Sequence, residues 1–556
     1  MKQILLTTLF ILLLPVWAWA SDAHYADLSD AGSSNIGTFA EPFNSMWTIN
    51  AHAFITGDDL YFKAGTDEIP STYLNIDWIG TSGDRVIIGA YDGDVDFDIT
   101  GSAKPILDGN FTIPDQYYGL IDIYKSSGGL VSIYVTIQDI QINNSKGHGI
   151  AIRGTWASPS GNGSENIVIE DCYVYRPWGS GISLSRGNNV QVNGCEVEEA
   201  GYNRTGSGYG PQAGIASNGS QATNLTVYNC VVHGCNGEGI GFYNYAPGGI
   251  AQHNIVYDCK TVGIYPAGSH DSIVYDNIVY QSTNYSTLFP AAGNMVGIWI
   301  TIEPGLTEEA YGHIIAGNYV GGPCSYGIYL NQNITITAAA LHDNYVYNNT
   351  VVDCGYNIGF NNYNISGGTP WSDNYVYNNL SYQTEVGVSG YHANVGSPTG
   401  VTFSNNYINA DGDWSSYLMG VNLVQLPASD DPIIKSAGWD AITAGAITFT
   451  NYLIGYFGLV STSACIDAAC SLTHPVSSGS ESTEVTVTDP LWFYGDEDIT
   501  IDTDKVTILS ITGSVLTIDE VITFGIGDPI YYRNFSGSAP DIGADEYIRK
   551  GVIIVN

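Results

Sequence analysis

Four side chains suited to acid–base chemistry lie within one stretch of the sequence, residues 204 to 260. Glu238 stands in the segment GEGI, His233 comes shortly before it, and Lys260 ends the segment HNIVYDCK. Arg204 belongs to a long polar turn further upstream. Removing a proton beside a carboxylate requires a base, an acid for the leaving oxygen and a cation that neutralises the carboxylate. We therefore predict that Lys260, Glu238, His233 and Arg204 are catalytic.

Two reactions fit these residues, elimination and hydrolysis. In an elimination, Lys260 or His233 serves as the base. A cation, Arg204 or Arg176, then faces the substrate carboxylate, while Glu238 is an acid or a calcium ligand. Hydrolysis instead needs a second carboxyl group, about 5–5.5 Å away for retention of configuration or about 6.5–9.5 Å away for inversion. The expected partners of Glu238 in a hydrolysis are Glu198, Glu199 and Asp258.

The charge of the chain argues against two classes of partner. The formal net charge is −39, with 16 Lys plus Arg against 55 Asp plus Glu. A nucleic acid or an anionic membrane surface would be repelled by most of such a surface. We therefore expect neither as a partner, and the sequence leaves the oligomeric state open.

The first 20 residues have the features of a signal peptide. They carry Lys2, an apolar run from Ile4 to Trp17, and the small-x-small ending Ala18-Trp19-Ala20. These features predict cleavage after Ala20 and a secreted protein. No later stretch has the roughly 20 apolar residues that a membrane-spanning helix needs, so we expect no membrane span.

A Gly-Ile step recurs along the chain, and it positions the candidate residues. The repeated isoleucines are Ile150, Ile182, Ile215, Ile240, Ile264, Ile298 and Ile328, followed by Ile358 after Asn357, and they are spaced by 24 to 34 residues. A period of this length is typical of a solenoid. The repeats alternate β-branched and polar residues, which favours strands over the helices of ankyrin or tetratricopeptide arrays. A β-propeller needs four strands per unit, and the shortest repeats have room for about three.

Two further series keep step with the repeat. One is an asparagine series, which we expect to form an internal hydrogen-bond ladder: Asn229, Asn254, Asn277, Asn318, Asn349, Asn379 and Asn406. The other is a set of cysteines, of which Cys172, Cys195 and Cys230 are expected to be buried thiols. Cys235 and Cys259 fit either thiols or a disulfide, and Cys465 and Cys470 fit a short-loop disulfide.

Both ends of the chain resemble a known family. The opening NIGTFAEPFNSMWTINAHAFITGDDLYFKAGTD (35–67) and the ending SAPDIGADEY (538–547) are similar to those of bacterial parallel β-helix repeat proteins of the pectate-lyase-like superfamily. The resemblance implies an all-β, right-handed parallel β-helix with an N-terminal cap and a small C-terminal β unit. We expect a signal peptide (1–20), an N-terminal cap and first coil (21–68), the β-helix (69–410) and a C-terminal capping region with an inserted β unit (411–556).

The resemblance also implies a polysaccharide as the partner. Proteins of this superfamily usually bind a glycan chain along one sheet between long turns, and here the long turns frame coils 180–265. The side chains expected to bind the substrate are Arg176, Trp178, Tyr202, Tyr243 and Tyr265, because aromatic rings can stack on sugars. Calcium is the expected cofactor of so acidic a chain, with Glu199 and Asp258 as its ligands.

The expected function is therefore that of a secreted polysaccharide lyase acting on an acidic glycan. A glycoside hydrolase of the same fold and a non-catalytic surface or adhesion protein are the alternatives. Products of elimination contain an unsaturated sugar that absorbs ultraviolet light, whereas products of hydrolysis do not. An adhesion protein would bind a glycan and leave it intact.

Overall fold

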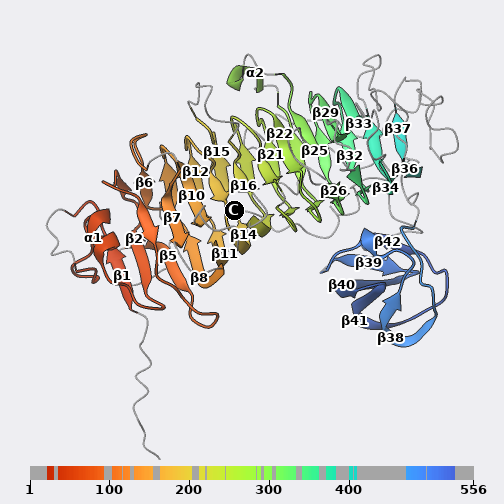
Figure 1. Cartoon of the computed structure of the whole chain (residues 1–556), viewed down its shortest axis with the longest axis horizontal. Helices are drawn as coiled ribbons and strands as arrows, with labels where there is room; N and C mark the ends of the chain where they lie inside the picture. The colour runs from red at the N-terminus through yellow and green to blue at the C-terminus, as the bar shows by residue number, and fades with distance from the viewer. Residues whose placement is uncertain are drawn as a thin grey trace, which may run out of the picture.

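The repeats fold into coils, and the strands of successive coils pair into three parallel sheets (Figure 1). The computed structural model describes residues 22–30, 36–92, 103–114, 117–125, 130–154, 163–202, 212–218, 222–244, 246–282, 285–289, 293–302, 309–332, 341–361, 371–382, 400–404, 406–409, 471–495 and 497–532. The predicted signal peptide, Arg204, Cys465 and Cys470 lie outside these residues.

The three sheets, named A, B and C, follow one another in each coil. Sheet A contains β1 (Ala23–Ala26), β2 (Asp59–Lys63), β5 (Val86–Tyr91), β8 (Leu130–Gln138), β11 (Gly163–Glu170), β14 (Gly187–Asn193), β17 (Ala222–Tyr228), β20 (Ile250–Gln252), β23 (Ile273–Tyr275), β27 (Ile314–Ala316), β31 (Tyr345–Tyr347), β34 (Asn374–Tyr377) and β36 (Val401–Ser404).

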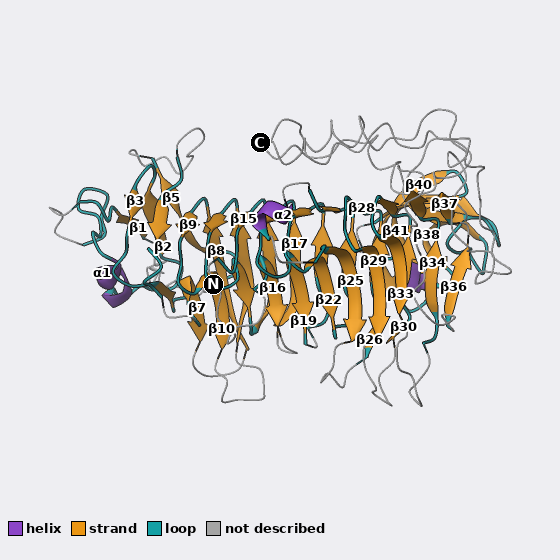
Figure 2. Ribbon diagram, turned by 90° about the horizontal axis from the view of Figure 1, so that it is seen from above, coloured by secondary structure: helices purple, strands orange, loops and turns teal. Residues whose placement is uncertain are grey.

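Sheet B contains β3 (Asp67–Glu68), β6 (Ile106–Asp108), β9 (Gln141–Asn143), β12 (Tyr173–Tyr175), β15 (Glu196–Glu198), β18 (Val231–His233), β21 (Ile255–Tyr257), β24 (Ile278–Tyr280), β28 (Tyr319–Gly321), β32 (Thr350–Val352), β35 (Leu380–Tyr382) and β37 (Tyr407–Asn409). Sheet C contains β4 (Leu74–Ile76), β7 (Gly119–Lys125), β10 (His148–Gly154), β13 (Ile182–Leu184), β16 (Ile215–Asn218), β19 (Ile240–Tyr243), β22 (Val262–Ala267), β25 (Val296–Ile302), β29 (Tyr326–Gln332) and β33 (Tyr356–Asn361). Figure 2 shows the strands of sheet C running side by side.

The remaining elements are few. Helix α1 (Met46–Ala51) lies near the first coils and begins at Ser45, whose side chain accepts a hydrogen bond from the Thr48 amide. Helix α2 (Tyr285–Leu288) follows β24, and β26 (Ala310–Tyr311) pairs with β30 (Leu341–His342). Among the described residues, no helix is long and apolar enough to cross a membrane.

The Gly-Ile step is explained by packing inside the coils. Ile240 pairs with Ile215 on one side and Ile264 on the other, and all three side chains are buried. A Cβ atom added to Gly239 would lie 2.4 Å from Val256 Cγ1 and 2.5 Å from the Gly263 carbonyl oxygen. Because real Cβ contacts are longer, only glycine fits at position 239, where the chain enters sheet C.

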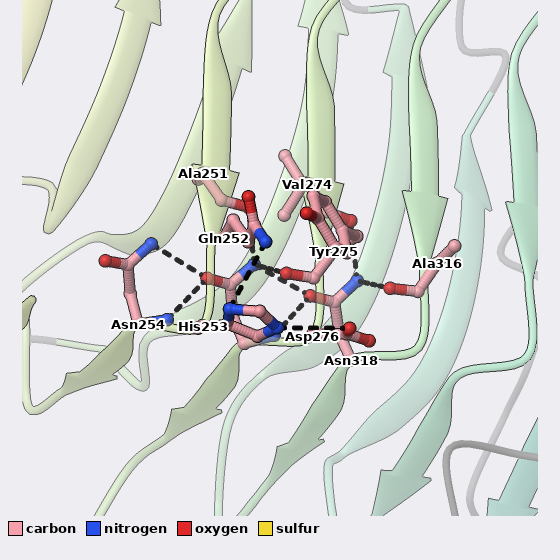
Figure 3. A network of polar contacts seen from close by, with 10 residues as sticks. Ala251, Gln252, His253, Asn254, Val274, Tyr275, Asp276, Ala316 and Asn318 are labelled. Carbon is pink, nitrogen blue, oxygen red and sulfur yellow. Dashed lines mark hydrogen bonds and ion pairs between the residues drawn. The ribbon is translucent and has the colours of Figure 1, made fainter. Parts of the chain in front are cut away.

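The asparagine ladder is confirmed from Asn254 to Asn406. The Nδ2 atom of Asn318 donates to the Val274 carbonyl at 2.8 Å and to the Ala316 carbonyl at 3.1 Å (Figure 3). The backbone amide of Asn277 donates to Asn318 Oδ1 at 3.0 Å. The same contacts recur on the following coils. These side chains supply the backbone partners that a buried turn would otherwise lack.

The expectation for Asn229 is wrong by one residue. Val231 pairs with Ile255, which places Cys230 rather than Asn229 next to Asn254. The Cys230 amide donates to Asn254 Oδ1, so a cysteine begins the ladder. Asn229 has a φ of 54° and takes the left-handed turn position that asparagine tolerates. Both positions suit asparagine, and the sequence pattern did not separate them.

The seven described cysteines, including Cys235 and Cys259, are buried thiols. This result confirms the expectation for Cys172, Cys195 and Cys230. Cys235 and Cys259 lie on neighbouring coils at equivalent positions. Burial raises the pKa of the Cys259 thiol, and the neighbouring Cys235 raises it further, so Cys259 stays protonated and unreactive.

A small antiparallel sheet near the C-terminus confirms the predicted C-terminal β unit. It contains β38 (Gly479–Thr486), β41 (Val515–Phe524), β40 (Asp504–Thr512), β39 (Asp498–Ile501) and β42 (Ile530–Tyr532), in that order. A short 3₁₀ turn, Pro490–Trp492, brings Trp492 against the outer face of sheet A. The ring of Trp492 lies 4.7 Å from that of Tyr345 and 5.0 Å from that of Tyr377. The C-terminal unit therefore packs on strands β31 and β34 of sheet A.

Candidate functional site on the outer face of sheet C

Glu238 lies on the outer face of sheet C, just before β19. The register places it beside Val262, in the outward row that continues with Val296, Tyr326 and Tyr356. Its side chain is 8% exposed. A carboxylate this deep needs hydrogen-bond donors, since burial without them is costly.

Two hydroxyl groups donate hydrogen bonds to Glu238. Tyr243 Oη donates to Glu238 Oε2 at 3.3 Å, and Thr261 Oγ1 donates to Oε1 at 3.2 Å. Burial, and after it the charge of Glu238, holds the pKa of Tyr243 well above its usual range. Tyr243 therefore keeps its proton at neutral pH and can give it only to a group that becomes strongly basic, such as a leaving alkoxide.

Lys260 lies in the turn that leads to the same face. Its Nζ donates to Asn236 Oδ1 at 2.8 Å, which places the ammonium group over the preceding coil. The Tyr285 hydroxyl of α2 donates to the Lys260 carbonyl at 2.6 Å. Because Thr261 follows Lys260 and contacts Glu238, the turn links two of the predicted catalytic residues.

His233 lies on a different sheet. It ends β18 on the outer face of sheet B, where its ring stacks 4.6 Å from that of Tyr257. His233 Nε2 lies 3.2 Å from Glu196 Oε1, and one ligand atom each of Glu196, Glu198 and His233 lies within 4.8 Å of the others. The sequence did not single out Glu196. Its alternation with Glu198 across Val197 was the available signal, because residues two apart share a face.

This cluster on sheet B has a donor set suited to a divalent metal. Two carboxylates and an imidazole are common ligands of zinc and related ions, whereas calcium prefers oxygen alone. Tyr173 donates to Glu198 and so helps to hold that carboxylate in place.

The expected calcium ligands are not brought together. Glu199 and Asp258 occupy equivalent positions two coils apart, with Gly234 between them. Glu199 accepts a hydrogen bond from Arg176 Nε at 2.5 Å. Asp258 accepts from the amide and the hydroxyl of Ser282, at 2.7 and 2.6 Å. Both carboxylates therefore brace turns between neighbouring coils.

Three of the predicted substrate-binding residues form a cluster at the turns between sheets B and C. The guanidinium of Arg176 lies 4.7 Å from the ring centroid of Tyr202. Phe111 stacks against both Trp178 and Tyr202, at 5.8 and 5.6 Å. The sequence did not point to Phe111, because it comes from a turn outside the numbered repeats. The cluster lies upstream of Glu238 along the solenoid.

The other two, Tyr243 and Tyr265, begin an aromatic row on the outer face of sheet C. Successive ring centroids are 5.8 Å apart from Tyr243 to Tyr265, 5.2 Å from Tyr265 to Trp299 and 5.7 Å from Trp299 to Tyr329. Tyr326 stacks on Tyr329 at 3.9 Å. Stacking of parallel strands about 4.8 Å apart produces this spacing.

Unpartnered polar atoms follow this row. Thr301, Asn331 and Asn361 occupy one outward row of β25, β29 and β33. Thr301 Oγ1, Asn331 Oδ1, Asn361 Oδ1 and Trp299 Nε1 are buried, and none has a hydrogen-bond partner among the described residues. Such atoms are costly to bury alone, so a polar ligand would stabilise them.

Comparisons with known proteins agree with the coil architecture. The family model described as right handed beta helix region matches residues 99–279. The uncharacterized protein YclG of Bacillus subtilis (strain 168) is 25% identical over 202 residues, which cover 29% of this chain and 34% of that protein. The matched part is therefore about a third of that relative.

Solved structures with similar folds include two lyases and a glycosidase. Pectate lyase Pel9A aligns with a TM-score of 0.47 and 16% identity, over 94% of this chain and 96% of that one. A rhamnogalacturonan lyase aligns with a TM-score of 0.46 and 16% identity, over 69% and 87%. The GH136 lacto-N-biosidase of Eubacterium ramulus aligns with a TM-score of 0.44 and 15% identity, over 70% and 68%. The three stacked parallel sheets, together with the right handed beta helix region matched over residues 99–279, show that the chain folds as a parallel β-helix with a small C-terminal antiparallel sheet.

Proposed function

We propose that the protein is a secreted polysaccharide-active enzyme that cleaves a glycan beside Glu238, by elimination at an acidic sugar. The observation that carries this proposal is the Glu238–Tyr243 pair, a buried carboxylate and a protonated phenol on the face that also bears the aromatic row. Clefts that bind ligands typically combine apolar rings with a few convergent polar groups. Secretion rests on the predicted cleavage after Ala20, which N-terminal sequencing of the exported protein would test.

The elimination would use the residues of this turn. Lys260 Nζ, in its neutral form, takes the proton on the carbon next to the sugar carboxylate. That electron pair forms a carbon–carbon double bond, and the bond to the glycosidic oxygen breaks. Tyr243 Oη, hydrogen-bonded to Glu238, gives its proton to the leaving oxygen. Of the two bases expected from sequence, Lys260 is favoured because His233 lies on sheet B.

A metal ion would neutralise the sugar carboxylate in such a reaction. Calcium is the ion that the acidic chain favours. Among the described residues, Glu196, Glu198 and His233 have ligand atoms close enough to share an ion, but they lie on sheet B and not on the Glu238 face, so an ion held there would stabilise the coils. We propose that added divalent cations raise the melting temperature through this cluster. The rise in melting temperature is measured by titrating wild type and His233→Ala with calcium and with zinc. Equal increases in melting temperature for both proteins would show that the ion does not bind at this cluster.

Hydrolysis is the second candidate, because Lys and Arg are so few around this face. In that reaction Glu238 would act together with another carboxyl group. The two candidates differ in their products, since elimination leaves an unsaturated sugar that absorbs ultraviolet light and hydrolysis leaves a new reducing end without it.

A screen of acidic and neutral polysaccharides, with and without calcium, tests the proposal. On the glycan that wild type degrades, Glu238→Gln and Tyr243→Phe should each lower kcat by about 10²–10⁴-fold, the range of a lost acid or base. Glu165→Gln is the matched control, because Glu165 on sheet A also accepts side-chain hydrogen bonds, from Ser132 and Asn188. Glu238→Gln with full activity would contradict the proposal. Binding without cleavage by wild type would point instead to an adhesion protein.

A further inference from the structure

Along half of the β-helix the sequence contains no permanent cation. Neither Lys nor Arg occurs between Lys260 and Lys435, a stretch that includes every strand from β22 to β37 and every turn between them. Upstream of it, the described chain carries Arg153, Arg176 and Arg186. A bound uronate is normally held by such a cation, because a carboxylate removed from water needs a charge partner.

The histidines described in this stretch do not replace the missing cations. His270 and His342 are each 2.7 Å from a carboxylate of the next residue, Asp271 and Asp343. His313 is fully buried, and burial lowers its pKa to about 3, so it is neutral. Against burial, which lowers it, hydrogen bonds to Asp343 and Glu309 raise the pKa of His342, but any charge on it is already paired with these two carboxylates. A carboxylated sugar on these coils would therefore meet acidic groups, the neutral His313 and histidines already paired with carboxylates.

The outer face of sheet C over the same coils suits an uncharged sugar. Trp299, Tyr326 and Tyr356 are half-buried, and they rest on the buried rings of Tyr265 and Tyr329. Tyr326 and Tyr356 are stacked 4.7 Å apart. Rings fixed in this way offer apolar surface at low entropic cost, which favours contact with the C–H faces of sugars.

The polar row of Thr301, Asn331 and Asn361 beside these rings includes acceptor atoms that lack hydrogen-bond donors among the described residues. Asn331 Oδ1 and Asn361 Oδ1 accept hydrogen bonds only, and both are buried without a partner among the described residues. A sugar hydroxyl can donate to them. An ionised carboxylate cannot, because it too only accepts.

We propose that the sugar units bound along β22, β25, β29 and β33 are neutral, so that the substrate is not a homopolymer of uronate. This inference rests on the proposed function and narrows its substrate. An acidic unit would bind upstream of these strands, where the sequence again contains Lys and Arg, and neutral units would bind along them.

Three homopolyuronates test the inference, those of galacturonate, mannuronate and glucuronate, each paired with its partly and its fully carboxyl-reduced form. Carboxyl reduction leaves backbone and linkage unchanged and removes only the charge. Binding to the inactive variant Glu238→Gln is measured by affinity electrophoresis at low and high salt. We expect reduction of at least one polymer to increase its affinity by about tenfold, and Trp299→Ala in the same background to lose about tenfold on that reduced polymer, since central aromatic anchors contribute at least this much.

The outcomes separate the two proposals. If reduction increases the affinity of none of the three polymers, while at least one intact polyuronate binds, the inference is overturned and a glycan site remains. If Trp299→Ala binds the reduced polymer like its parent, the downstream neutral site is overturned. If no polymer of either kind binds, and wild type degrades no glycan, the proposed function fails and the inference fails with it.

Discussion

Aromatic side chains cover the outer faces of sheets A and C on neighbouring coils, and the two faces differ in what packs against these side chains. On sheet A, Trp492 of the C-terminal unit packs against Tyr345 and Tyr347, and the Tyr347 hydroxyl donates to the Trp492 carbonyl at 2.7 Å. On sheet C, Trp299 lies between Tyr265 and Tyr329, and its Nε1 has no partner among the described residues. The Tyr347 hydroxyl therefore has its partner within the protein, whereas the Trp299 indole N–H lacks one among the described residues.

The two faces also differ in how they hold a buried carboxylate. Glu238, on sheet C, accepts hydrogen bonds from two side-chain hydroxyls. Glu497, in the C-terminal unit, accepts one from the Tyr494 amide, and its Oε1 atom is without a partner among the described residues. Burial raises the pKa of Glu497 well above its usual range. Each oxygen of Glu238 therefore has a donor, whereas Glu497 is held as a protonated acid.

The largest loss of stability is expected from Trp492→Ala. Trp492 is 2% exposed and contacts four tyrosines of the β-helix. Its truncation should destabilise the C-terminal unit by about 3–5 kcal/mol, as for other buried large aromatics. Urea unfolding and limited proteolysis measure this loss. Leu491→Ala is the control, because Leu491 is 54% exposed. Unchanged protease resistance of Trp492→Ala would mean that the interface does not stabilise the unit.

A smaller change in stability, this time a gain, is expected from Glu497→Gln. The raised pKa of Glu497 means that its stabilising contribution is fully present below the unfolded pKa of about 4.3 and is lost as pH rises through the folded pKa. Glutamine stays neutral, so the variant should be more stable than wild type by about 1–3 kcal/mol at pH 8 and equally stable at pH 4.

Thermal unfolding at both pH values measures this difference. Glu484→Gln, at an exposed position of the same unit, should show no such pH dependence. If Glu497→Gln and wild type lose stability in parallel as the pH rises, Glu497 is ionised in the folded protein and its burial does not raise its pKa.

The smallest effect is expected from Tyr347→Phe. This variant removes only the hydroxyl that donates to the Trp492 carbonyl. A single hydrogen bond of this kind contributes about 0.5–1.5 kcal/mol, and the ring contacts with Trp492 and Tyr532 remain. The free energy of unfolding of the C-terminal unit is the measurement. A loss as large as that of Trp492→Ala would show that the hydrogen bond, rather than ring packing, holds the interface.

Much of the fold could be predicted from local patterns. The Gly-Ile spacing predicted the coils because, at the glycines of this step from Gly149 to Gly327, an added Cβ would lie too close to Val side-chain and backbone carbonyl atoms where the chain enters sheet C. The ladder from Asn254 onward followed from the same register. The error at Asn229 arose because turn and ladder positions are adjacent and both accept asparagine.

The candidate site was predicted less completely. Glu238, Tyr243 and Tyr265 do share one face, since spacing within a strand determines the side on which residues lie. His233 was expected near Glu238 because the two are close in sequence, yet a turn places them on different sheets. Phe111 and Glu196 were missed because their partners come from other coils.

The sequence by itself determined the coil period, the internal ladders and the absence of Lys and Arg between residues 261 and 434, because these depend on residue type and spacing alone. The tertiary structure decided which tyrosines are covered by the C-terminal unit and which surround Trp299, because the packing of a distant segment is not encoded in any one repeat. It also decided that Tyr243 and Thr261 donate to Glu238, since those contacts depend on how one coil stacks upon the next.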